Sequence, residues 1–168
     1  MEKIYETAYA KINLGLDVLG KRSDGYHEVR MVMQSVGLSD AVEIEEGEGL
    51  VVETDHSGLA GGPDNLAWKT AELLARCCGK IPNVHIRLNK KIFLAAGLAG
   101  GSSDAAAVMR GLSRLWQLDL TAPELEKLAA ELGSDIPFCI TGGTALAEGR
   151  GEILTELPEA PELLLVLA

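Results

Sequence analysis

Residues 96–108 read Ala-Gly-Leu-Ala-Gly-Gly-Ser-Ser-Asp-Ala-Ala-Ala-Val, and the prediction of the fold is organised around this stretch. Its glycines allow backbone conformations with positive φ and let another group approach closely, because no Cβ stands in the way. Ser102, Ser103 and Asp104 then offer N-cap side chains, and the alanines behind them favour helix. The stretch therefore predicts a glycine-rich turn that leads directly into a helix.

A helix that begins behind such a turn directs free N–H groups and the positive end of its dipole at the turn. Together they form a site for an anion such as phosphate. An ordinary loop before an ordinary helix explains the same residues. The Walker phosphate loop is excluded because Ser102-Ser103 stands where it requires Lys-Ser or Lys-Thr, and the spacing Gly-x-Gly-x-x-Gly is missing.

Composition sets the outer limits of the prediction. A chain of 168 residues with 47% hydrophobic content can bury one core, so we expect a single domain. The net charge of −10 argues against nucleic acid or an anionic membrane surface as partner. An anionic ligand would need a local basic pocket. Each residue that could supply its charge is also explained as an ordinary solvated side chain on the surface: Lys11, Lys21, Arg22, Lys90 and Lys91.

The cysteines and the apolar runs bear on the cellular compartment. Cys77, Cys78 and Cys139 are odd in number with two adjacent, which suits neither a disulfide framework nor a four-ligand zinc site. No N-terminal signal segment is visible, and the longest apolar runs are shorter than a membrane span. We therefore expect a soluble, cytoplasmic protein with reduced cysteines.

The N-terminal part predicts strands. Residues 4–20 alternate apolar and other residues, which places Lys11 and Asn13 on the face opposite the apolar one. Three further strands are predicted to form a meander, with turns at 37–40 and 47–49 between them: residues 29–36, 41–46 and 50–54.

Helices are predicted around the glycine-rich turn. Asp64 is expected to cap a helix that ends at 79–83, with one face made of Leu66, Thr70, Leu73, Leu74 and Cys77. A strand over 84–88 then brings Lys90 and Lys91 to the edge of the turn. The helix behind the turn carries an apolar stripe of Ala105, Val108, Met109, Leu112, Leu115 and Trp116.

The C-terminal part predicts one more helix and two strands. Thr121 and Glu124 form a capping box for a helix that runs to Leu132 and stops at Gly133. A strand over 144–148 leads to a turn at 149–151. Residues 162–168 are apolar throughout and predict a strand buried on both faces. Because the sequence ends inside it, we expect a fragment or a lone domain of a longer protein.

Two motifs outside the turn admit two interpretations each. Tyr26 and His27 fit packing plus a surface imidazole, or a pair that stacks on and hydrogen-bonds a planar base. Asp135, beside Ser134 after the Gly133 stop, is by itself better explained as a capping residue than as a catalyst.

Several motifs together resemble the GHMP small-molecule kinases, in an order and spacing that hold along nearly the whole chain. The matching segments are residues 8–14, Gly25-Tyr26-His27, Asp64-Asn65-Leu66, and residues 96–107, 133–138 and 142–151. The resemblance implies an α+β fold, the GHMP-kinase N-terminal domain, in which a mainly antiparallel sheet packs against helices in two layers. Residues 1–168 would be this ATP-binding domain, and the family's second domain would be absent.

Within the family, the motifs resemble members that phosphorylate the 2-hydroxyl of 4-diphosphocytidyl-2-C-methyl-D-erythritol, a step of the non-mevalonate (MEP) isoprenoid pathway. The cofactors implied are ATP and Mg²⁺, with no metal ligand identified. This small molecule would be the partner, with neither nucleic acid nor membrane. The surface that a missing domain leaves bare would invite self-association.

The resemblance also assigns roles to residues. Lys11 and Asp135 would be the catalytic pair, which reverses the capping interpretation of Asp135, and substrate would be bound by Asn13, Tyr26 and His27. ATP would be bound by Asn65 near the adenine and by the loop residues Ala96, Gly97, Leu98, Ala99, Gly100, Gly101, Ser102 and Ser103. Phe93 departs from the pattern, which often has proline there, and this leaves the start of the loop less rigid.

Two alternatives stay open. One is another kinase of the same family, acting on homoserine, a sugar or a mevalonate derivative, although Tyr26-His27 favours the cytidine substrate. The other is a nucleotide-binding module without catalysis, which the presence of both Lys11 and Asp135 disfavours.

Overall fold

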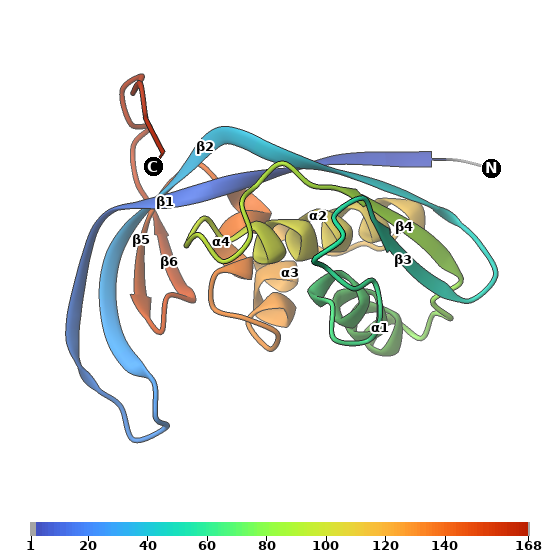
Figure 1. The fold of residues 1–168 in the computed structure, drawn as a ribbon. Coiled ribbons are helices and arrows are strands. Elements are labelled where there is room, and N and C mark those ends of the chain that lie inside the picture. Colours follow the sequence, from blue (N-terminus) through green and yellow to red (C-terminus); the bar gives the residue numbers. More distant parts are fainter. Residues whose placement is uncertain (1–2, 168) are drawn as a thin grey trace.

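The computed structural model describes residues 3–167, which form one six-stranded sheet and four helices (Figure 1). In chain order the elements are β1 (Lys3–Lys21), β2 (His27–Glu46), β3 (Leu50–Thr54), α1 (Leu66–Cys78), β4 (Val84–Asn89), α2 (Gly100–Leu115), α3 (Ala122–Ala129), α4 (Ile136–Thr141), β5 (Thr144–Gly149) and β6 (Ile153–Glu156). The helices gather on one side of the sheet, so the expected two-layer α+β architecture is confirmed.

The long strand β2 is the centre of the sheet. It pairs antiparallel with β1, β4 and β5, and β6 pairs antiparallel with β5. β3 pairs with β4 in parallel, so β4 lies between β2 and β3 and the predicted meander is wrong. The connection through α1 allows this order, because parallel neighbours need a long crossover.

The predicted turn at residues 37–40 is also wrong, since β2 runs through it. Tyr9 pairs with Ser39 and Lys11 with Ser35, so three residues of β2 lie opposite one residue of β1. A β-bulge accommodates extra residues without ending the strand. Opposite the bulge, Ala10 and Lys11 are both buried, so Lys11 does not lie on an exposed polar face as the alternation predicted.

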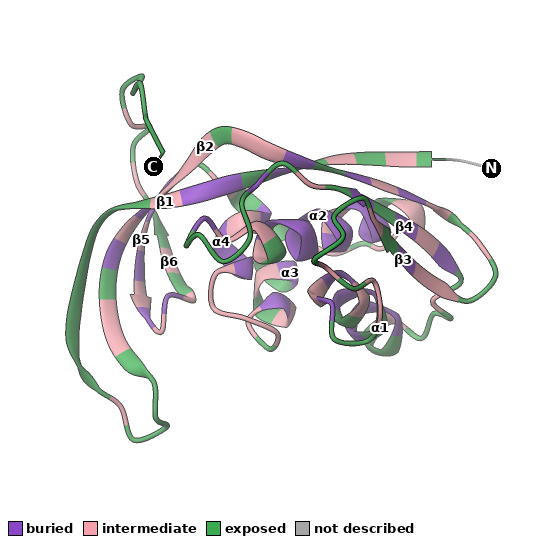
Figure 2. Ribbon diagram, in the orientation of Figure 1, coloured by how far each residue is buried: buried purple, intermediate pink, exposed green. Residues whose placement is uncertain are grey.

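The apolar face predicted for the rest of β1 is exposed. Leu14, Leu16 and Val18 are 47%, 49% and 59% exposed. This part of β1 is an exposed edge strand of the sheet (Figure 2), whereas its partner in β2 also pairs with β5 and buries Met31 and Met33 against Phe138. Alternation indicates a strand correctly here, but it does not show whether anything packs on that strand.

The caps of α1 and α2 differ from those predicted. Asn65, not Asp64, caps α1, and Cys77 is exposed instead of lying on the buried face. α2 begins at Gly100 behind Ala99, so Ser102, Ser103 and Asp104 lie within the helix and do not cap it. The predicted stop of α1 at Gly79 is confirmed by its left-handed conformation, with φ 63°.

α2 is the central helix of the core, and the predicted apolar stripe is confirmed. Its residues Val108, Met109 and Leu112 are fully buried against Ile44 of β2 and Leu74 of α1. Leu115 and Trp116 pack at the margin of the same core.

α3 begins with the predicted capping box, in which the Thr121 N–H donates to Glu124 Oε2 at 2.8 Å. It ends at Ala129, three residues before the predicted Leu132, because turns replace the helix there.

The last segment departs most from its prediction. Residues 162–167 form no strand, with Leu164 and Val166 at 99% and 90% exposure, and Ala168 lies outside the described residues. A strand buried on both faces needs neighbouring strands and layers, and no described strand pairs with this segment. The strand β6, which forms a hairpin with β5, was not predicted.

No helix within residues 3–167 is long and apolar enough to cross a membrane.

Candidate active site

The loop between β4 and α2 has an unusual backbone. Ala95, Gly97 and Ala99 have positive φ values of 55°, 73° and 57°, a conformation that alanine rarely adopts. Alternation of φ sign turns successive N–H groups toward a common concavity, and such concavities bind anions. No side chain caps the first turn of α2, so its N–H groups stay open to a ligand.

Two hydrogen bonds fasten this loop and the start of α2 to β1. The Lys11 N–H donates to the Leu98 carbonyl at 3.1 Å. The Ser103 hydroxyl donates to the Tyr9 carbonyl at 2.6 Å. Beneath them, Ala10, Ile92 and Leu98 form a small apolar cluster. The strained backbone is therefore held by contacts on both sides, as a pre-organised site requires.

The Lys11 ammonium meets Asp135 beside this loop. Lys11 Nζ lies 3.7 Å from Asp135 Oδ2 and 3.4 Å from Asn13 Oδ1, and its side chain is 7% exposed. Asp135 occupies the N-cap position of α4, but its side chain makes no cap hydrogen bond and is 34% exposed. Its carboxylate is thus turned to the lysine and to solvent, which does not fit the capping interpretation.

Tyr26 and His27 lie at the far end of the β1–β2 hairpin. The Tyr26 ring is 54% exposed and the Arg150 guanidinium lies 5.0 Å from its centroid, a cation–π contact that covers one face. Arg150 belongs to the β5–β6 turn, where a Cβ built on Gly151 would lie 3.8 Å from the Cβ of Ser134, the neighbour of Asp135. The turn therefore lies between the tyrosine and the Lys11–Asp135 pair. Arg150 was not predicted as part of a site, because nothing in the sequence distinguishes it from an ordinary charged residue in a glycine turn.

Asn65 uses both ends of its amide within the protein. Its Oδ1 accepts from the Ala67 N–H at 2.9 Å, which is the cap of α1, and its Nδ2 donates to the Ala60 carbonyl at 2.8 Å. Its predicted contact with adenine stays a prediction.

Lys90 is not a free cation for an anionic ligand. Its ammonium is buried and paired with Asp40 and Asp104. Arg22 is likewise engaged, with Asp24 at 3.0 Å and Glu28 at 2.5 Å. Burial raises the pKa of the Asp104 carboxyl to about 7, against the opposing effect of Lys90. The sequence assigned Asp40 to a turn and Asp104 to a cap, so it did not predict that either carboxylate pairs with Lys90.

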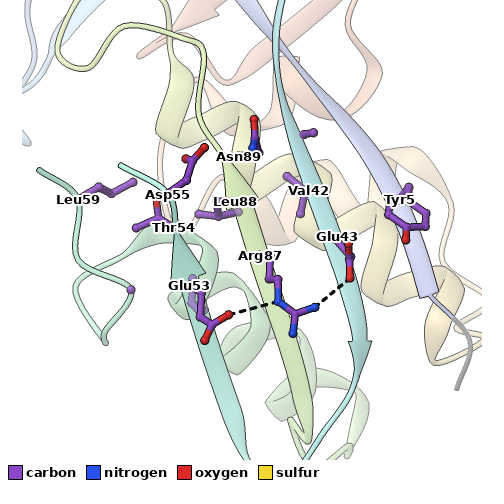
Figure 3. A pocket seen from close by; sticks show the side chains of 13 residues that line it. Tyr5, Val42, Glu43, Glu53, Thr54, Asp55, Leu59, Arg87, Leu88 and Asn89 are labelled. Atoms are coloured by element: carbon purple, nitrogen blue, oxygen red, sulfur yellow. Dashed lines mark hydrogen bonds and ion pairs between the residues drawn. The ribbon is translucent and has the colours of Figure 1, made fainter. Parts of the chain in front are cut away.

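Neither a metal site nor the cavity on β2, β3 and β4 lies at the Lys11–Asp135 pair in the part of the chain that the structure describes. Within residues 3–167 no three His, Cys, Asp or Glu side chains gather as a metal site. A cavity of about 760 Å³ lies on β2, β3 and β4, where Arg87 reaches Glu43 at 2.9 Å and Glu53 at 3.2 Å (Figure 3). Neither Lys11 nor Asp135 lines it.

Relatives and solved structures match most of the chain. The sequence profile described as "GHMP kinases N terminal domain" matches residues 65–143. The 4-diphosphocytidyl-2-C-methyl-D-erythritol kinase of Synechococcus sp. (strain JA-3-3Ab) is 52% identical over 162 residues, with 96% of this chain and 52% of the relative covered. The kinase of the same name from Bacillus pumilus (strain SAFR-032) is 51% identical over 168 residues, with 99% and 58% covered.

A crystal structure of 4-(cytidine 5'-diphospho)-2C-methyl-D-erythritol kinase superposes with a TM-score of 0.77 at 38% identity, covering 92% of this chain and 55% of that one. A mevalonate kinase structure matches with a TM-score of 0.70 at 14% identity over 92% and 56% of the two chains, which shows the shared fold alone. The chain spans about half the length of the curated relatives it matches. By its sequence and its fold, the chain carries a GHMP kinase N-terminal domain.

Proposed function

We propose that this domain provides the ATP site and the catalytic pair of a kinase that phosphorylates the 2-hydroxyl of 4-diphosphocytidyl-2-C-methyl-D-erythritol. The observation that carries the proposal is the pairing of Lys11 with Asp135 at 3.7 Å, directly beside an uncapped helix start. The names of the relatives about 50% identical to the chain support the choice of substrate.

Asp135 is the proposed base. Phosphoryl transfer depends on positioning and charge stabilisation, with one group that accepts the proton of the attacking hydroxyl. The carboxylate is partly exposed and makes no cap bond, so a hydroxyl can reach it. The Lys11 ammonium favours the ionised form of the carboxylate and stabilises negative charge on the phosphoryl group in transit.

The loop of residues 96–103 is the proposed phosphate site. Its alternating positive φ values and the free N–H groups of α2 suit the phosphate oxygens of ATP. Mg²⁺ bound with ATP would neutralise phosphate charge. Because no described acidic or imidazole cluster can hold the ion, phosphate oxygens and water would supply most of its ligands.

The hairpin end supplies the proposed acceptor site. One face of the Tyr26 ring lies against Arg150, and the other face is available to stack on the cytosine. His27 is exposed beside it and can hydrogen-bond the base, while Asn13 lies next to Lys11 for the acceptor alcohol.

The proposed acceptor site has one wall in this chain. Because the relatives are almost twice as long, we expect their remaining residues to complete the cleft. The chain alone would then bind the acceptor weakly and turn over slowly. Self-association through exposed apolar hairpin residues and a cytoplasmic location stay predictions.

The test is a phosphoryl-transfer assay with ATP, Mg²⁺ and 4-diphosphocytidyl-2-C-methyl-D-erythritol. It uses this chain and a fusion that adds, after Ala168, the remaining residues of the Bacillus pumilus relative. Asp135→Asn should abolish transfer in the fusion but retain ATP binding, while Asp119→Asn, which neutralises an exposed carboxylate between α2 and α3, should leave transfer unchanged.

Three outcomes would change the proposal. Transfer to homoserine or mevalonate but not to the cytidine compound would assign another substrate. ATP binding without transfer to any alcohol would leave a nucleotide-binding module. Full transfer by Asp135→Asn would show that Asp135 is not the base.

A further inference from the structure

The Lys90 side chain lies behind the glycine-rich loop, 1% exposed, between two carboxylates that are 0% and 2% exposed. These belong to Asp40 on β2 and Asp104 in the second turn of α2. Lysine and aspartate are almost never this deeply buried unless paired, so the three residues, here named the Lys90 cluster, hold one another in place. The proposed mechanism uses none of them.

The Lys90 cluster touches both ends of the loop. Asp40 Oδ1 accepts from the backbone N–H groups of Lys91 at 2.5 Å and Ile92 at 2.8 Å, which fixes the start of the loop. Asp104 holds the first turns of α2 through the lysine. A Cβ built on Gly100, the first residue of α2, would lie 3.6 Å from Lys90 Nζ and 3.0 Å from Ile92 Cγ2. The Lys90 cluster is therefore bonded to the backbone at the start of the loop and lies close behind Gly100, where the N–H groups that face a ligand begin.

The Lys90 cluster carries one cation and up to two anions. With both carboxylates ionised, its net charge is −1 in a region closed to water. Asp104 Oδ1 has no hydrogen-bond partner, which makes the ionised form costly. That charge also lies next to the helix N-terminus, where it opposes the field that attracts an anion. A proton on one carboxylate brings the net charge to zero.

Within residues 3–167, no second cation pairs with Asp40 or Asp104. The buried faces of α1 and α4 carry only uncharged residues, and the buried lysine of β1, Lys11, is turned to Asp135. On the loop side, Asp55 accepts from the Lys90 backbone N–H at 2.9 Å and adds another acidic group.

We propose that the Lys90 cluster is a positioning device for the glycine-rich loop, and that it takes up a proton at Asp104 when a polyphosphate binds there. The proton comes from solvent and forms an O–H bond on the Asp104 carboxyl. The inference rests on the proposed function in one respect, that the loop is the phosphate site.

The direction of the effect follows from linkage. An anion at the loop favours the protonated, neutral Lys90 cluster, so the pKa of Asp104 rises further from about 7 on binding. Affinity for ATP should therefore fall as pH rises from 6 to 8.5, by about three- to tenfold beyond any fall due to the nucleotide itself. Asp104→Asn keeps the shape and removes the charge, so its affinity at pH 8.5 should exceed that of the unmodified chain.

The first experiment is titration calorimetry of the 168-residue chain with ATP at pH 7, in two buffers of different ionisation enthalpy. The unmodified chain should take up more protons per ATP than Asp104→Asn. The surface variant Asp119→Asn should behave like the unmodified chain. Equal proton uptake and equal pH profiles in the unmodified chain and Asp104→Asn would overturn the inference and leave the proposed function intact.

The second experiment needs no nucleotide. NMR should show the Asp104 carboxyl carbon titrating near pH 7 and the amide resonances of residues 96–103 shifting with the same midpoint. Those amide shifts should vanish in Asp104→Asn, and the carboxyl titration tests the unmodified chain even if that variant does not fold. If the amide resonances of residues 96–103 do not shift as Asp104 titrates, the positioning role is overturned. Failure of every variant to bind ATP at any pH, with the loop titration present, would instead refute the phosphate site.

Discussion

The backbone N–H of Lys11 donates to the carbonyl of Leu98 at 3.1 Å, so the lysine nearest Asp135 is also a support of the glycine-rich loop. The two contacts use different parts of the residue. Its main chain fixes the loop, while its ammonium lies on Asp135. Lys11 lies opposite the bulge in β2, where it and its neighbour Ala10 are both buried.

This division predicts that Lys11→Met separates nucleotide binding from transfer. The backbone bond to Leu98 survives and the apolar part of the side chain is kept, so the Kd for ATP should change less than about threefold. Loss of the ammonium should slow transfer by about 10²- to 10³-fold, the usual effect of removing one group that stabilises developing charge. Single-turnover assays of the fusion, with separate ATP titrations, measure both; parallel losses would contradict the division.

Asn65 offers a test of which of its two amide contacts stabilises the fold. Asn65→Ala removes both amide contacts and should lower the free energy of unfolding by about 1 to 2 kcal/mol. Asn65→Asp keeps an oxygen for the Ala67 N–H and loses only the donor to Ala60, so it should cost about half as much. Urea denaturation compares the two. Equal losses would show that the bond to Ala60, not the cap, carries the stability.

The parts of the fold that sequence predicted well are those set by local patterns. β3 and β4 were predicted within a residue, because their apolar alternation is bounded by glycine and asparagine turns. The α1 stop at Gly79 follows from the one residue type that tolerates the left-handed conformation well. The Lys11–Asp135 pair came from a resemblance, since the two residues are far apart in sequence and no spacing rule joins them.

Long-range effects account for what was missed. Gly37 and Asp40 resemble a turn, yet pairing with β1 on one side and with β4 and β5 on the other holds β2 as one strand. Lys11 is buried although alternation assigns it to a polar face, because it contacts Leu98 and Asp135, and a two-residue period cannot show such long-range contacts. Asp104 resembles a cap residue because it follows two serines at the start of a helix. Its pairing with Lys90 was missed because that lysine lies on the other side of the loop in sequence.

Gly61 is required by a close approach to β3. An ideal Cβ there would lie 1.8 Å from the Val52 carbonyl oxygen, whereas one on Gly62 meets nothing within 4 Å. Gly61→Ala must push the loop before Asn65 off the strand, and it should cost about 2 to 4 kcal/mol of stability. Gly62→Ala is the matched control and should change stability by less than about 1 kcal/mol. Thermal or urea unfolding that ranks the two equally would contradict the close approach.

The cysteines should differ in reactivity. Burial raises the pKa of the Cys139 thiol to about 11, while Cys77 is exposed on α1. At pH 8 only about one Cys139 thiol in a thousand is ionised, and the thiolate is the form that reacts. Iodoacetamide should therefore modify Cys77 in the native chain and Cys139 only in denaturant, as peptide mass spectrometry can follow. Comparable native rates at both sites would show that Cys139 is accessible.

The buried carboxyl of Asp104 should make stability depend on pH. Its pKa is about 7 in the folded chain against an ordinary 3.8, so between these values the folded state keeps a proton that the unfolded state has lost. The free energy of unfolding therefore contains a contribution that falls as pH rises from about 4 to about 7 and is level above that.

Asp104→Asn lacks this group, so the stability of the unmodified chain relative to the variant should fall by up to about 4 kcal/mol between pH 4 and pH 8. Urea titrations at pH 5 and pH 8 on the unmodified chain, Asp104→Asn and the surface control Asp119→Asn measure the change. If the difference between the unmodified chain and Asp104→Asn stays constant across this range, the carboxyl is ionised throughout. Lys90 would then stabilise both anions of its cluster, and the cluster would carry a fixed negative charge behind the loop.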